Sequence, residues 1–203
     1  MIKEEFMNAV NSYASIPGNE KIFWEEIETR YAEKSRHYHT MAHIENLILE
    51  LTPVKASFSQ WHVVVFAVAY HDIIYKPSRT NNEEKSAEFA VERLKSIDVP
   101  SELIVRCRDF IIATKRHEPM DNEIDLLTDA DLSILGSDSN SYQLYAKQVR
   151  KEYSVYPDLL YKAGRKKVLL HFLGMPHIYK STFFRDKYEA TARWNLKNEL
   201  DSL

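Results

Sequence analysis

The sequence has few of the residues on which β-rich and disulfide-bonded proteins depend. Its 203 residues include four glycines and one cysteine. β-rich folds usually need more glycines in their turns, so this scarcity favours helices. A single cysteine, Cys107, cannot form an internal disulfide, which suggests a reducing compartment. Because Cys107 lies in the apolar run 103–112, we expect a buried small side chain rather than a nucleophile.

The sequence also lacks a basic excess and a long apolar run. Its formal net charge of −3 argues against general binding to nucleic acids or anionic membranes. The longest strongly apolar run, Val63–Tyr70, is far shorter than the ~20 residues that span a bilayer. Residues 1–6 show neither the apolar stretch nor the cleavage site of a signal peptide. We therefore expect a cytoplasmic protein with no membrane partner and no stable nucleic-acid partner.

Apolar residues recur at helical spacing almost throughout, which predicts an all-α protein of about ten helices. The length fits one domain over 1–203. Segment 60–74 is apolar nearly all round and could be a buried strand by periodicity alone, but its length favours a central buried helix. Gly136 is a natural C-cap for the seventh helix, and we read Trp24, Trp61 and Trp194 as core anchors. The predicted helices cover approximately 3–15, 20–33, 39–51, 60–74, 83–97, 101–114, 124–135, 141–153, 158–172 and 181–202.

A histidine and an aspartate, His71 and Asp72, stand side by side at the end of the most apolar helix. Burying a charge without a partner is costly. A divalent cation would satisfy both residues, because it binds imidazole nitrogen and carboxylate oxygen together. A capping aspartate beside a satisfied core histidine is the alternative explanation for such a pair.

Two further residues fall on apolar helix faces. His43 shares a face with Leu47, because positions i and i+4 line one side of a helix. Asp131 lies four residues after Leu127 and three before Ile134, so we expect it to point towards the core, where an aspartate needs a partner. We therefore predict a metal site formed by His43, His71, Asp72 and Asp131. His39, one turn before His43, and Asp129, which we place towards solvent or the edge of the site, are expected in the second shell.

This set of residues resembles the HD superfamily of metal-dependent phosphohydrolases, and in particular a bacterial family of predicted HD phosphohydrolases. The resemblance covers roughly residues 20–203, with core motifs at about 36–136 and helices at 141–203 that would pack on them. It rests on ordered motifs rather than on any single one. They are Arg36-His37-Tyr38-His39, His43-Ile44, residues 70–75, 82–87, 112–117 and 129–136, and in the tail 149–153, Gly164-Arg165 and 192–196.

The resemblance implies hydrolysis of a phosphate ester through a metal-activated water. The substrate would be a small phosphorylated metabolite, plausibly a nucleotide. The cofactor would be one divalent transition metal, namely Mn, Fe, Co, Ni or Zn, with Mg less suited to imidazole ligands. A second metal would draw on Asp129 and His117. The sequence does not decide the oligomeric state.

Further residues are candidates for the reaction itself. Asp72 could also orient the water, and Glu83 could act as an acid or base. Asn82 is expected in the second shell, where capping of a helix explains it better than contact with substrate does. The cations that could hold a phosphate are Arg36, Lys115 and His117. Two alternatives remain at this point: a non-catalytic regulatory module that binds metal and ligand, and a structural protein with satisfied core polar residues.

Overall fold

The computed structural model describes all 203 residues. The chain forms ten α-helices, two short 3-10 helices and no strand, which confirms the all-α prediction. It divides into two compact units, Met1–Glu118 and Pro119–Leu203. A single domain over 1–203 remains a prediction. None of the helices is both long and apolar enough to cross a lipid bilayer.

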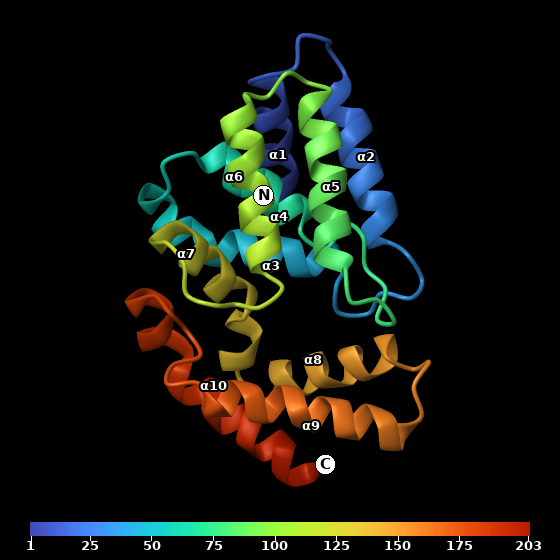
Figure 1. The fold of residues 1–203 in the computed structure, drawn as a ribbon, viewed down its shortest axis with the longest axis vertical. Coiled ribbons are helices and arrows are strands. Elements are labelled where there is room, and N and C mark those ends of the chain that lie inside the picture. Colours follow the sequence, from blue (N-terminus) through green and yellow to red (C-terminus); the bar gives the residue numbers. More distant parts are fainter. The chain divides into compact units, whose positions relative to one another are not determined.

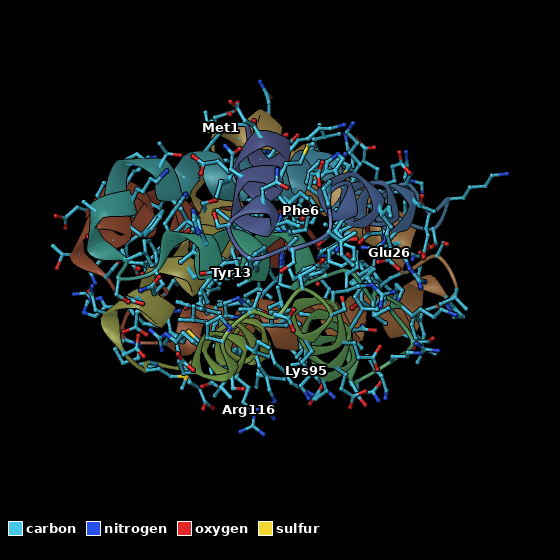
Figure 2. All side chains as sticks on the ribbon, turned by 90° about the horizontal axis from the view of Figure 1, so that it is seen from above. Met1, Phe6, Tyr13, Glu26, Lys95 and Arg116 are labelled. Carbon is cyan, nitrogen blue, oxygen red and sulfur yellow. The ribbon has the colours of Figure 1, made fainter.

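The first unit contains six α-helices and one 3-10 helix. Helices α5 and α6 run side by side, as Figure 1 shows, and α1 packs against α2. Figure 2 looks down on the molecule with Phe6 on α1, and shows Lys95 and Arg116 extending outwards at the surface. The elements are α1 (Ile2–Asn11), α2 (Asn19–Tyr31), α3 (Met41–Leu51), η1 (Thr52–Ser57), α4 (Trp61–Tyr70), α5 (Asn82–Lys95) and α6 (Ser101–Ala113).

Helix α4 is the centre of this unit. Residues Val63 to Tyr70 are all buried, and α1, α3, α5 and α6 all pack against the helix. Phe6 of α1 meets Phe66 and Tyr70 edge-on, with ring centroids 5.8 and 5.7 Å apart. Each such fully buried side chain contributes about 1.5–3 kcal/mol of hydrophobic free energy. The prediction of a central buried helix is therefore confirmed.

The second unit contains α7 (Asn122–Asp131), η2 (Ser133–Gly136), α8 (Ser139–Glu152), α9 (Asp158–Gly174) and α10 (Thr182–Ser202). Helix α10 packs closely against η2 and α9. Gly136 makes the first of these contacts feasible, because a Cβ added there would lie 2.5 Å from Cβ of Tyr188. Our prediction that Gly136 caps a helix ending at Leu135 was wrong. Helix α7 ends at Asp131, and Gly136 leaves room for the Tyr188 side chain of α10.

Several other expectations need correction. Helix α1 ends four residues early, where the Ser12 hydroxyl donates to the carbonyl of Asn8. Helix α4 ends at Tyr70 rather than at Ile74, and η1 follows α3 in a stretch to which no helix was assigned. Trp194 is 56% exposed and is not a core anchor, whereas Trp24 is 2% exposed. Cys107 is fully buried in α6, and burial raises the pKa of its thiol, which confirms a packing role.

Candidate metal centre

The candidate site in the first unit is formed by the start of α3, with the residues just before it, and by the residues that follow α4. His39 lies just before α3 and His43 in its first turn, while His71 and Asp72 follow the last residue of α4. The end of α4 leaves backbone carbonyls without helical partners. Arg36 takes up two carbonyls beyond that end: its Nη1 donates to Asp72 O at 2.7 Å and its Nη2 to Ile73 O at 3.0 Å.

Arg36 also ties the two segments together, because its Nη1 donates to His39 O at 3.2 Å. Its side chain is buried, and its guanidinium lies over the rings of Tyr31 and Tyr75. We predicted a substrate-binding role for Arg36. Both terminal nitrogens donate to backbone carbonyls, so Arg36 holds the two segments together, and its contact with substrate remains a prediction.

Three polar atoms converge at the centre. Nε2 of His43 lies 3.1 Å from Nε2 of His71, and Oδ2 of Asp72 lies 3.2 Å from Nε2 of His71 and 3.8 Å from Nε2 of His43. Nε2 of His39 lies 3.9 Å from the same carboxylate oxygen. His43 and His71 are buried. The sequence-predicted residues of the first unit therefore do come together.

One hydrogen bond orients the ring of His71. Nδ1 of His71 lies 2.9 Å from the carbonyl oxygen of Val68, which can only accept, so Nδ1 carries a proton and Nε2 is turned towards the centre. Nε2 faces a carboxylate oxygen and a second imidazole nitrogen. A backbone carbonyl on the far nitrogen is also what orients metal-ligating histidines in general.

The spacing fits a cation. Ligand atoms about 2.0–2.2 Å from one ion lie roughly 3.0–3.5 Å apart in octahedral or tetrahedral arrangements. Two of the three separations, 3.1 and 3.2 Å, fall in this range. Mixed nitrogen and oxygen donors suit divalent transition metals. The residues present therefore fit the metal that the sequence predicted.

The electrostatics agree with this description. Burial by itself would raise the pKa of the Asp72 carboxyl, but the imidazoles of His71, His39 and His43 outweigh burial and hold that pKa well below its usual value. Asp72 is therefore a carboxylate at neutral pH. Burial raises the pKa of the Glu83 carboxyl, and the negative charge of Asp72 adds to the rise. Glu83, half-buried in the first turn of α5, is thus better suited to carry a proton than an exposed glutamate.

Two neighbouring residues, Asn82 predicted in the second shell and Lys115 predicted to bind substrate, have structural partners. Asn82 Nδ2 donates to Lys76 O at 2.9 Å, and its Oδ1 accepts from Lys76 N at 3.1 Å, so it closes the loop before α5. Lys115 donates to Thr80 O at 2.7 Å and pairs with Glu84. His117, in the loop after α6, has a left-handed backbone with φ of 53°. Its role remains a prediction.

The two aspartates of α7 differ from our expectation. Asp129 is fully buried, and its oxygens accept hydrogen bonds from the backbone NH groups of Lys180 and Ser181 at 2.9 and 2.7 Å. The Ser181 hydroxyl and the Lys180 ammonium complete its contacts at 2.7 and 3.1 Å. Placing Asp129 towards solvent was wrong, because the start of α10 covers it. Asp131 ends α7 and is half-buried. Its role as fourth ligand remains a prediction.

Comparison with protein-family models, with curated proteins and with solved structures found no match to this chain.

Proposed function

We propose that the chain is a metal-dependent phosphohydrolase of the HD type that acts on a small phosphorylated metabolite such as a nucleotide. The observation that carries this proposal is the convergence of His43 Nε2, His71 Nε2 and Asp72 Oδ2 on one another, at separations of 3.1, 3.2 and 3.8 Å. The order of motifs that resembles the HD superfamily supports the same reading.

The proposed ligands of the metal are His43, His71, Asp72 and Asp131. His43 and His71 belong to a group of side chains that could hold a metal ion. A divalent ion bound there would lower the pKa of a water molecule and draw charge from a phosphoryl oxygen. One transition metal ion, namely Mn, Fe, Co, Ni or Zn, is the proposed cofactor.

The chain's own residues then have defined tasks. The Asp72 carboxylate, ionised at neutral pH, would orient the attacking water by accepting its hydrogen bond. Glu83, with its raised pKa, would hold a proton for the leaving oxygen. Arg36 would keep the His71-Asp72 segment fixed relative to His39. We also propose that the protein works in the cytoplasm.

Metal content and phosphate release test this proposal together. The purified protein is assayed for bound metal, and then for phosphate released from a panel of nucleotides and sugar phosphates with added Mn²⁺, Co²⁺, Ni²⁺ or Mg²⁺. We expect metal in the wild type and turnover that falls at least about a hundredfold in Asp72→Ala, since metal ligands contribute several kcal/mol. Glu88→Gln is the matched control, because Glu88 is exposed and pairs only with Lys85.

The remaining outcomes separate the alternatives. Bound metal without turnover on any substrate would favour a regulatory module that binds metal. Absence of metal from the wild type, together with unchanged stability of Asp72→Ala, would overturn the metal site itself.

A further inference from the structure

The second unit contains a cavity of about 340 Å³ between α8 and α10. This volume lies within the range of small-molecule sites, about 300–1,000 Å³. The side chains that matter here come from both helices: Tyr142, Gln143 and Lys147 from α8, and Trp194, Asn198 and Glu199 from α10. None of them belongs to the candidate metal centre.

Trp194 is the most unusual of these residues. Its side chain is 56% exposed, and its indole NH has no hydrogen-bond acceptor, whereas the indole NH groups of Trp24 and Trp61 donate to Glu28 and Glu5. A large aromatic face and an unused donor at the mouth of a cavity form a platform for a flat ring. Stacking of a nucleic-acid base on an aromatic side chain is worth about 1–3 kcal/mol.

The charge of the cavity favours an anion. Its carboxylate, Glu199, is already neutralised, because Arg165 donates to it at 2.7 and 2.8 Å and the Tyr142 hydroxyl at 2.6 Å. Lys147 has no such partner: its ammonium is exposed and forms no ion pair. The cavity thus carries one uncompensated positive charge, which a phosphate group would complement.

The polar groups at the rim suit a base with both donors and acceptors on its edge. Asn198 is exposed and makes no side-chain hydrogen bond, and Gln143 uses only its amide NH₂, which donates to Ser139 Oγ at 3.3 Å. Each carboxamide offers a donor and an acceptor. From the flat indole, the two carboxamides and the single cation, we propose that this cavity binds a mononucleotide, at a site separate from the metal centre.

The test uses the full-length protein in excess EDTA, so that no metal-dependent binding contributes. Calorimetric titration with the four ribonucleoside 5′-monophosphates is compared with adenosine, ribose 5-phosphate and inorganic phosphate. We expect at least one nucleotide to bind more tightly than all three comparison compounds, and to quench tryptophan fluorescence as it binds. Phosphate or ribose 5-phosphate binding as tightly as every nucleotide would overturn the proposal, as would absence of nucleotide binding.

Variants locate the binding. Trp194→Ala should weaken nucleotide binding between about fivefold and a hundredfold, as expected for one lost stacking contact. Lys147→Gln should weaken it by up to about fivefold. Lys151→Gln, an exposed lysine one turn further along α8 and outside the cavity, is the matched control and should bind as the wild type does.

A second variant separates this proposal from the phosphohydrolase. Asp72→Ala should bind the nucleotide with unchanged affinity, even if it abolishes metal binding. Binding that disappears in Asp72→Ala but persists in Trp194→Ala would place the nucleotide at the metal centre and overturn the second site. Because Trp194 is largely exposed, its replacement is compatible with folding, and a thermal melt of each variant verifies this.

Discussion

In the second unit, a largely buried arginine and glutamate satisfy each other, whereas in the first unit two buried imidazoles and a half-buried carboxylate direct possible metal-binding atoms at one point. Arg165 and Glu199 form two hydrogen bonds at 2.7 and 2.8 Å, and their side chains are 7% and 12% exposed. His43 Nε2, His71 Nε2 and Asp72 Oδ2 instead meet at separations of 3.1 to 3.8 Å. We call the Arg165–Glu199 pair the complete cluster, because its opposite charges satisfy each other, and the His43–His71–Asp72 group the incomplete cluster, because all three atoms can bind one cation.

The largest effect should come from breaking the complete cluster. Glu199→Ala leaves the Arg165 guanidinium buried without its carboxylate, and we expect a loss of about 3 kcal/mol in the free energy of unfolding. Urea denaturation followed by circular dichroism measures it. The double variant Arg165→Met/Glu199→Leu removes both charges and should recover most of the loss. Equal losses in the single and double variants would show that packing, not charge, stabilises this pair.

The incomplete cluster should respond to metal instead. Mn²⁺ or Co²⁺ at a hundred times its dissociation constant should stabilise the wild type by about 2.7 kcal/mol, because only the folded state offers the site. Thermal melts with metal and with EDTA measure the gain. Glu199→Ala should keep this gain, since its change lies in the other cluster, and Asp72→Ala should lose it. A gain that survives in Asp72→Ala would contradict the assignment of the ligands.

The positioning role of Arg36 should appear in metal affinity. Arg36→Lys keeps the charge but loses the planar fork that takes the carbonyls of Asp72 and Ile73. We expect metal affinity to fall about ten- to a hundredfold, as for residues that orient metal ligands. Calorimetric titration measures the affinity, and the visible spectrum of the Co²⁺-loaded protein reports the geometry of the ligands.

Arg93→Lys is the matched control for this variant. Arg93 forms a two-point contact with Glu26 in the same unit, with both separations at 2.7 Å, away from the candidate ligands. It should lose stability without a change in the Co²⁺ spectrum. A spectrum and an affinity that stay unchanged in Arg36→Lys would reduce Arg36 to a purely structural residue.

The sequence predicted what depends on local pattern. The helical class, the buried α4 and the convergence of His43, His71 and Asp72 follow from periodicity and from the cost of burying polar groups. The sequence could not predict partners supplied by distant segments. The buried environment of Asp129 depends on the start of α10, 51 residues away, and the engagement of Arg36 depends on carbonyls 36 and 37 residues away. The spacing of residues around a single helix reveals neither of these contacts.

The prediction that Trp194 lies in the core failed for a related reason. A tryptophan on an amphipathic helix usually lies in the core, and nothing in the pattern of α10 marks this one as exposed. The unpaired Lys147 and Asn198 are likewise visible only once α8 and α10 are placed beside one cavity. The apolar residues nearest to Trp194 in the helix, Ala192 and Leu196, are themselves buried, which is why the pattern favoured a core position.

The smallest expected effect is a difference in the pH dependence of stability between a buried and an exposed ion pair of the second unit. Burial by itself would raise the pKa of Glu199, but hydrogen bonds from Arg165 and Tyr142 and the charge of Arg165 lower it. A lowered pKa in the folded state means that this stabilisation is complete above the unfolded value of about 4.3 and is lost as the pH falls through the folded value. Between about pH 5 and 3, the free energy of unfolding of the wild type should therefore fall by on the order of 1 kcal/mol. Glu199→Gln lacks this contribution already at neutral pH.

Asp158 provides the contrast for this titration. Arg150 also lowers the pKa of Asp158, with the two side chains 2.6 Å apart, but this carboxylate is exposed and water screens the pair. Free energies of unfolding measured from pH 7 to 3 should follow the wild-type curve in Asp158→Asn and a flatter curve in Glu199→Gln. The same flattened curve in both variants would show that the exposed Arg150–Asp158 pair stabilises the protein as much as the buried Arg165–Glu199 pair does. That result would contradict the role given to burial.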